Sequence, residues 1–217
     1  MSNPIFNRTA LRAGMGISRR ANAPISKAIL LATGIRTKQI WRLPFMGCDA
    51  YVRTIRGLTH DALVVRDPKD GELKIGDALV SDGCVLTPID VWERGCLDDG
   101  DRVCVWVPNG WTEISGKGAS DYWLMHVLGC KYDKVAIAQL LVKTLAGDWL
   151  SNKVGLYSNF YCTEGVQASF ERAGHYPYYP NSNATPGTTF RRLLDKRLLP
   201  VAGALTEYGE RFAVDLS

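Results

Sequence analysis

The cysteine at position 162 is the residue whose setting best suits chemistry. It stands in the stretch 158–164, where a polar pair and two aromatic residues come before the cysteine. Val166, Phe170 and Ala173 follow it at offsets of four, eight and eleven residues, which is the spacing of one face of a helix. Cys162 is therefore expected in the first turn of a helix, on the side that faces the core.

The expected helix has clear signals at both ends. Asn159 is a candidate N-cap, because its side-chain oxygen can accept an unpaired amide hydrogen of the first turn. Gly174 suits the end of the helix. A thiol in the first turn feels the positive end of the helix dipole, which favours the nucleophilic thiolate. The alternative is a small buried cysteine without chemistry, since free cysteine is among the most buried residue types.

A cysteine nucleophile needs a base, and the chain has three histidines. His60 is the leading candidate, because it begins an apolar run (62–65) in a predicted strand of a sheet that should face the helices. His126 lies in an aromatic-rich predicted helix, where a packing or surface role is expected. His175 follows the end of the Cys162 helix and is the alternative base.

Length and composition describe a soluble globular chain. The 217 residues suffice for one domain with a sizeable core and an extension, and 46% hydrophobic with 22% charged residues is ordinary. The net charge of +4 is mild, so we do not expect a nucleic-acid partner. No two of the six cysteines form a C-x-x-C pair, so we predict reduced thiols, no metal site and no cofactor.

Targeting signals are weak. The apolar stretch 28–32 follows a lysine but is short for a signal peptide. No apolar run approaches the roughly 18 residues needed to span a bilayer. We therefore expect a protein without a membrane span that is cytoplasmic as synthesised.

The first 40 residues differ in charge from the rest. No acidic residue occurs before Asp49, whereas seven residues in this region are basic: Arg8, Arg12, Arg19, Arg20, Lys27, Arg36 and Lys38. We predict a basic N-terminal arm over residues 1–40 and one domain over residues 41–217. Such an arm could bind a protein partner, or pack as a solvated extension on its own domain.

Within residues 41–217, strand signals come first and helix signals second. Alternation and turn residues predict strands at 49–55, 59–65, 73–80, 84–87 and 101–107. Besides the Cys162 helix, helices are expected at 121–128, at 134–146 (buried, capped by Asp133) and at 190–199 (capped by Thr188 or Thr189), with a surface loop at 176–186. This order predicts an α+β fold. An antiparallel sheet or partial barrel from the N-terminal half would pack against helices from the C-terminal half.

Several short motifs, in this order, resemble the circularly permuted NlpC-type (YiiX-like) branch of the papain-like cysteine peptidases. They are Gly47-Cys48-Asp49, residues 59–65, Ile75-Gly76-Asp77-Ala78, residues 83–88, residues 129–133, residues 160–164 and Thr185-Pro186. Histidine precedes cysteine here, whereas papain and unpermuted NlpC enzymes place the cysteine first. The resemblance covers about residues 44–200 and implies a permuted papain-like fold.

The resemblance also implies roles for individual residues. Cys162 would be the nucleophile and His60 the general base. Asp77 stands where the family usually has a glutamate that orients the histidine. An aspartate is one methylene shorter, so the hydrogen bond to the imidazole is expected to be longer or shifted. Ser81 and Asp82 are nearby alternatives for this role.

Two further residues keep structural alternatives. Asp77 could be a simple turn carboxylate, since aspartate is common in turns. Glu164 matches the family's glutamate after the nucleophile, and its expected role is structural, as an acid near a helix start.

The resemblance implies hydrolysis of an amide through a thiolate acyl-enzyme, with a peptidoglycan peptide or another peptide amide as substrate. The alternative is a structural or assembly component, for example of a phage tail, that keeps the fold with weak or no activity. In that setting the protein would be part of a phage particle. Acyl transfer to a lipid by the same Cys/His pair is less favoured, because no amphipathic membrane helix is evident.

Overall fold

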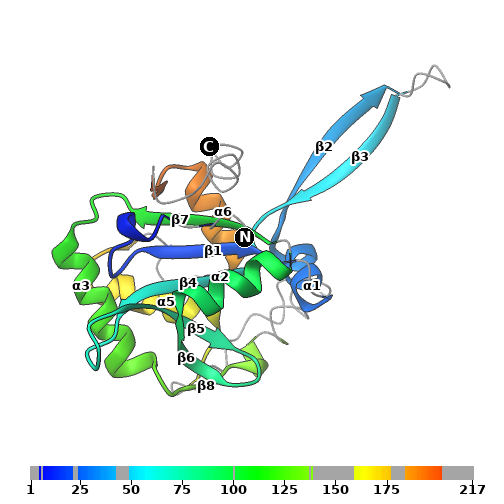
Figure 1. The fold of residues 1–217 in the computed structure, drawn as a ribbon. Helices are drawn as coiled ribbons and strands as arrows, with labels where there is room; N and C mark the ends of the chain where they lie inside the picture. The colour runs from blue at the N-terminus through cyan, green and yellow to red at the C-terminus, as the bar shows by residue number, and fades with distance from the viewer. Residues whose placement is uncertain are drawn as a thin grey trace.

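The structure, a computed structural model, describes residues 5, 7–21, 24–42, 49–99, 101–136, 138, 159–176 and 184–201. Its fold is α+β, as predicted, with a six-stranded antiparallel sheet and several helices (Figure 1). The two outer strands of this sheet, β10 and β6, do not pair with each other. Among the described strands the sheet is therefore open and not a closed barrel.

The strand order of this sheet is β10-β7-β1-β4-β5-β6. Its members are β1 Gly16–Arg20, β4 His60–Arg66, β5 Leu73–Leu79, β6 Gly83–Pro88, β7 Arg102–Pro108 and β10 Leu198–Pro200. Two smaller pairs accompany it: an antiparallel hairpin of β2 Ile35–Arg42 and β3 Asp49–Arg56, and a short parallel pair of β8 Lys131–Tyr132 and β9 Asn159–Phe160.

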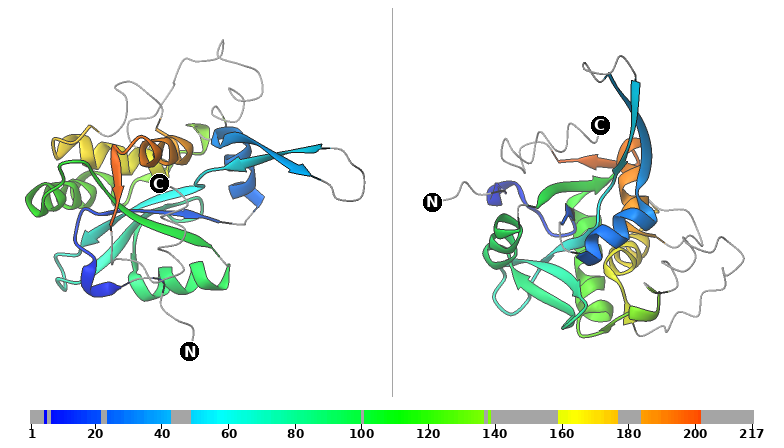
Figure 2. Two further views of the ribbon diagram at one scale, coloured as in Figure 1. Left: turned by 90° about the horizontal axis from the view of Figure 1, so that it is seen from above. Right: turned by 90° about the vertical axis from the view of Figure 1, so that its right-hand side faces the viewer.

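The helices are α1 Pro24–Thr33, α2 Ile89–Asp98, α3 Glu113–Tyr122, α5 Cys162–Arg172 and α6 Pro186–Leu194, with a 3₁₀ turn at Arg8–Ala10 and a π-helical turn at Trp123–Val127. Helix α2 lies on one side of the sheet, and α5 and α6 lie on the other (Figure 2). Within the described residues, no helix has the length and apolar character that crossing a membrane requires.

The five strands predicted from sequence are confirmed, each within two residues of the expected ends. The four residues 62–65 of β4 are all fully buried, although an antiparallel strand with one wet face would alternate. The reason is that helices cover both faces of the sheet. A continuous apolar run in the sequence therefore marks the centre of this sheet.

The expected division at residue 40 is wrong, because part of the predicted arm lies inside the domain. Strand β1 pairs with β7 on one side and β4 on the other, and Ile17 is fully buried. Arg19, counted as a solvated charge, forms an ion pair with buried Asp101 at 3.3 Å. The basic composition concealed a central strand, and the charge of its Arg19 is paired inside the fold.

Helix α3 begins earlier than the predicted helix at 121–128. Thr112 caps it, accepting a hydrogen bond from the Ser115 amide while the Ser115 hydroxyl accepts one from the Thr112 amide. The sequence 121–128 then covers the last turn of α3 and the π-helical turn. The prediction missed this start because serine stands here at the capping-box position where glutamate or glutamine is usual.

The predicted final helix at 190–199 is also displaced. Helix α6 starts at Pro186, capped by the Thr185 side chain, which accepts from the Thr188 amide at 3.1 Å. It ends at Leu194, and Lys196 follows with a positive φ of 58°. The apolar pair Leu198-Leu199 belongs to β10, which extends the sheet beside β7. Proline at the first helical position suits a helix start, and the predicted loop therefore ends before it.

The predicted helix at 134–146 lies mostly outside the described residues. Residues 134–136 and 138 are helical, and Asp133 Oδ1 accepts from the Ala136 amide at 2.8 Å, which confirms the predicted cap. Val135 is 52% exposed, so the expected burial fails at this residue. Of the predicted loop 176–186, residues 177–183 lie outside the described residues as well.

Candidate active site

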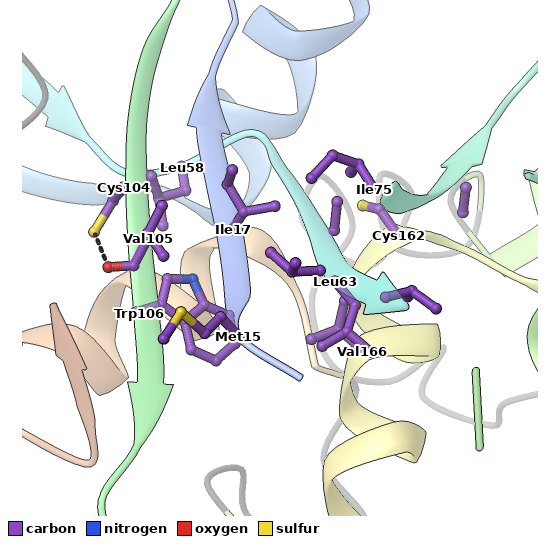
Figure 3. Close-up of a cluster of buried hydrophobic side chains, with 14 of the residues drawn as sticks. Met15, Ile17, Leu58, Leu63, Ile75, Cys104, Val105, Trp106, Cys162 and Val166 are labelled. Carbon is purple, nitrogen blue, oxygen red and sulfur yellow. Dashed lines mark hydrogen bonds between the residues drawn. The ribbon is translucent and has the colours of Figure 1, made fainter. Parts of the chain in front are cut away.

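Cys162 is the first residue of α5, as predicted. Figure 3 shows Cys162 and Val166 on the side of α5 that faces Leu63 of β4. Val166 and Phe170 are fully buried and Ala173 is partly buried, and Gly174 follows the helix with a φ of +83°. The helical spacing therefore identified the buried face and the end of the helix correctly.

The predicted N-cap at Asn159 is wrong. Tyr161 occupies the cap position, and no side chain caps the helix there. Asn159 lies instead in β9, opposite Lys131 of β8. This pair fixes the chain directly before Cys162, together with the Tyr161 hydroxyl, which donates to the carbonyl of Ala184. Strand pairing here replaces the local cap that the sequence suggested.

His60 and Asp77 lie side by side next to Cys162. His60 is the first residue of β4, and its Nε2 lies 2.5 Å from Oδ1 of Asp77 on the neighbouring strand β5. The Cys162 thiol is near enough to the same imidazole to raise its pKa. Since Nε2 is held by Asp77, Nδ1 is the ring nitrogen left for the thiol. The structure thus brings all three predicted site residues together.

The electrostatics of this group favour a charged imidazole. Burial disfavours the imidazolium, but the charges and hydrogen bonds of Asp77 and Cys162 outweigh it and raise the pKa of His60 to about 10. Burial would likewise raise the pKa of Asp77, but the charge and hydrogen bond of His60 outweigh it and lower that pKa below its usual value. Arg19 and Trp92 contribute to the same lowering.

Trp92 and Arg19, which the sequence did not assign to the site, lie behind Asp77. The indole Nε1 of Trp92, on α2, donates to Asp77 Oδ2 at 2.9 Å. The Arg19 guanidinium lies over the Trp92 ring at 5.4 Å and adds positive charge near Asp77. The aspartate is therefore shared between His60 and Trp92, and its orientation is fixed. The expected lengthening of the His60 hydrogen bond is not observed.

The alternative candidates lie elsewhere. Ser81 and Asp82 are exposed in a turn and hydrogen-bond to each other at 2.7 Å. His126 is exposed and stacks on Tyr122, with ring centroids 4.6 Å apart. His175 is partly buried after the end of α5, and burial lowers its pKa. None of these four has a described contact with Cys162.

Glu164 lies in the first turn of α5, as expected for its structural role. The reading of Asp77 as a simple turn carboxylate is contradicted, because Asp77 lies within β5 and is 1% exposed.

The remaining thiols provide a contrast with Cys162. Five of the six cysteines lie in the described residues, and all five are free. Cys84, Cys96 and Cys104 are buried, and burial raises the pKa of each to about 12. Cys162 is the thiol that has an imidazole beside it in the described part of the chain.

Solvent reaches the group from the imidazole side. Cys162 is 1% exposed, whereas the His60 side chain is 13% exposed. Tyr132, near enough to Cys162 to interact with its charge, also lines a pocket of about 520 Å³. The pocket lies between the β5–β6 turn and the β8–β9 pair, and its lining includes Ser81, Lys131, Tyr132, Lys134, Val135 and Asn159.

No protein-family model matches the chain, and no curated protein sequence matches it significantly. The assignment of a function therefore rests on the residues and their geometry.

Proposed function

We propose that this protein is a cysteine hydrolase of the papain-like type that cleaves an amide bond through a thiolate acyl-enzyme. One observation carries the proposal: the thiol at the start of α5 lies beside an imidazole whose other nitrogen is held by a buried carboxylate. A nucleophile, a base and a group that orients the base are the components of this chemistry.

The chemistry follows from these positions. His60 Nδ1 takes the Cys162 proton, and the thiolate attacks the amide carbon to form a tetrahedral oxyanion. Amide hydrogens of the first turn of α5 have no partner within the helix, so they can donate to this oxyanion. The imidazolium then protonates the leaving nitrogen as the C–N bond breaks. Water, deprotonated by His60, releases the acyl group and restores the thiol.

The proposed substrate is a peptide amide, with peptidoglycan peptides as the leading class through the family resemblance. The pocket beside Tyr132 has the volume that a small ligand or short peptide segment requires. Its apolar Val135, two lysines and polar Ser81 and Asn159 could contact both the backbone and the charged groups of a peptide.

The proposal predicts that Cys162 reacts with iodoacetamide faster than the other buried thiols. Cys84 is 1% exposed and Cys104 is fully buried, which matches the 1% exposure of Cys162. A difference in alkylation rate between these thiols would therefore reflect the imidazole beside Cys162 and not a difference in solvent access. We expect mass spectrometry after labelling at pH 7 to show Cys162 modified at least tenfold faster, with loss of the difference in His60→Gln.

Cys162→Ser identifies the modified peptide. Partly exposed Cys130, whose described bond is to the backbone carbonyl of His126, reports the reactivity of a thiol that has solvent access but no described imidazole contact. Equal labelling of Cys162 and Cys104 in the wild type would refute the nucleophile assignment.

The second candidate is a structural or assembly component, such as a phage-tail part, that keeps the fold without activity. The 1% exposure of Cys162 favours it, because reactive cysteines are usually at least partly exposed. The same labelling experiment decides between the two, since an inert Cys162 is the outcome that the second candidate requires.

A further inference from the structure

Asp61 is a buried carboxylate that the proposed mechanism does not use. It follows His60 on β4 and is fully buried. Three hydroxyl groups donate to it: Ser18 to Oδ1 at 2.5 Å, and Thr163 and Thr189 to Oδ2 at 2.6 and 2.8 Å. Burial raises the pKa of Asp61, and the three hydroxyl donors oppose this rise because they stabilise the charged form.

The three donors come from three different elements. Ser18 lies on β1, Thr163 on α5 and Thr189 on α6, so the carboxylate ties two helices to the sheet. The indole of Trp106 on β7 donates to Ser18 at 2.7 Å, which leaves the Ser18 hydroxyl proton for Asp61. The direction in which the Ser18 hydroxyl donates is therefore defined.

Thr163 connects this cluster to the nucleophile. It directly follows Cys162, and its Oγ1 lies 3.8 Å from Cys162 Sγ. Because the Thr163 hydroxyl donates to Asp61, the Thr163 oxygen is held in place beside the thiol, whose proton remains available to His60. Two consecutive residues of β4 thus act on Cys162. His60 acts on the thiol directly through its imidazole, and Asp61 acts through the hydroxyl of Thr163.

We propose that Asp61 is a positioning residue of the candidate site. It holds the Thr163 hydroxyl, and with it the first turn of α5, so that Cys162 Sγ faces His60. The inference rests on the proposed function, because it assigns Asp61 a role in the reactivity of Cys162. A misplacement of reacting groups by about 1 Å can cost about a hundredfold in rate, so a small shift of α5 would be measurable.

Thr163→Val tests the inference. Valine keeps the shape of threonine and removes the hydroxyl that Asp61 holds, and Thr163→Ser restores the hydroxyl. The matched control is Ser169→Ala, which deletes another fully buried hydroxyl of α5, one that donates to the Gly165 carbonyl at 2.9 Å and has no described bond to Asp61. The readout is the rate constant for alkylation of Cys162 by iodoacetamide between pH 5 and 9, alongside thermal unfolding.

We expect Thr163→Val and Asp61→Asn to slow alkylation of Cys162 about tenfold or more, with an altered pH profile. Thr163→Ser should recover most of the rate, and Ser169→Ala should lose stability without losing the rate. The inference is overturned if Thr163→Val and Ser169→Ala change the rate equally, or if serine does not rescue it. A wild-type Cys162 no faster than Cys104 overturns the proposed function as well. Thr163→Val keeps the test decisive even where Asp61→Asn fails to fold.

Discussion

Asp77 reaches His60 although its side chain is short. Its Oδ1 reaches His60 at 2.5 Å while its Oδ2 accepts from Trp92. Because both oxygens have donors, the carboxylate cannot rotate without breaking a buried hydrogen bond. The antiparallel pairing of β4 with β5 brings Asp77 next to His60. Tertiary packing, and not side-chain length, therefore places the Asp77 carboxylate against His60.

The His60–Asp77 pair predicts a defined pH dependence of stability. The pKa of His60 is about 10 in the folded protein and about 6.5 when unfolded, so its protonation favours the folded state. This contribution is complete below pH 6.5 and disappears as the pH rises to 10. The Asp77 contribution has the opposite sign, because its pKa is lowered. It is present above pH 3.8 and disappears at more acidic pH.

Chemical unfolding of wild type and His60→Gln across pH 4–10 measures this contribution. We expect the variant to lose about 3–5 kcal/mol at pH 5–6.5, as for other broken buried pairs, and the difference to shrink towards pH 10. His126→Gln is the control, since that histidine is exposed and has no described carboxylate partner. A pH-independent difference between wild type and His60→Gln would contradict the pairing.

The candidate site was predictable from sequence where its signals are local. A cysteine before a helical pattern, and a histidine at the start of an apolar run, were enough to place Cys162 and His60. Trp92 was not predictable, because its indole reaches Asp77 only after α2 packs on the sheet. The bond between Asp61 and Thr163 joins residues 102 positions apart, and no local pattern marks such a pair.

At the scale of elements, the position of α5 is set by glycines packed against Trp123. The ring of Trp123, on the π-helical turn, is fully buried between Gly165 of α5 and Gly76 of β5. A Cβ on Gly165 would lie 2.9 Å from the ring, and one on Gly76 would lie 2.5 Å from its Nε1. Both glycines are therefore required by close approach. The helix that carries Cys162 sits at a depth fixed by these contacts.

Gly165→Ala should accordingly displace α5. We expect a loss of about 1–3 kcal/mol, typical of overpacking, and slower alkylation of Cys162 as the helix start moves from His60. Gly118→Ala in α3 is the matched control, because its added Cβ would meet nothing closer than 3.6 Å. In the control, better helix propensity should stabilise the protein by about 0.5–1 kcal/mol. Thermal or denaturant unfolding gives both values, and a neutral Gly165→Ala would show that α5 is not held by this contact.

Among the elements, strands were easier to predict than helix ends. The strands are short apolar runs bounded by turns, and their limits follow from the turn residues, as at Asp67 and Gly71. The starts of α3 and α6 depend on the caps Thr112 and Thr185. The sequence alone does not distinguish these threonines from others, because capping depends on the backbone conformation. Neither the π-helical turn nor the late strand β10 has a distinct sequence pattern.

At the scale of the molecule, net charge is concentrated in one hairpin. Five of the 26 basic residues and one of the 22 acidic residues lie in residues 35–56, so the other 21 basic and 21 acidic residues balance. Figures 1 and 2 show the β2–β3 hairpin extending away from the body of the protein. The predicted basic arm, residues 1–40, thus contains strand β1 inside the sheet, helix α1 and most of β2. Because the β2–β3 hairpin carries the net charge and projects, it is the part that could bind a protein partner.

These two parts predict opposite results for two deletions. Removing residues 1–40 takes away β1 from the middle of the sheet, so this variant should not fold. Removing residues 35–56 should leave the fold intact. The Cα of Gly34 lies only 3.3 Å from where a Cβ on Gly57 would be, so two added glycines can join them. Circular dichroism and thermal unfolding measure both outcomes.

Charge gives the hairpin deletion a second readout. The variant loses four net positive charges and should elute from a cation exchanger at pH 7 at much lower salt than the wild type. Any partner bound through the hairpin should be lost with it, while the alkylation rate of Cys162 should stay unchanged because its described contacts lie in the body. An unfolded hairpin-deletion variant, or a folded variant lacking residues 1–40, would refute this division of the N-terminal region.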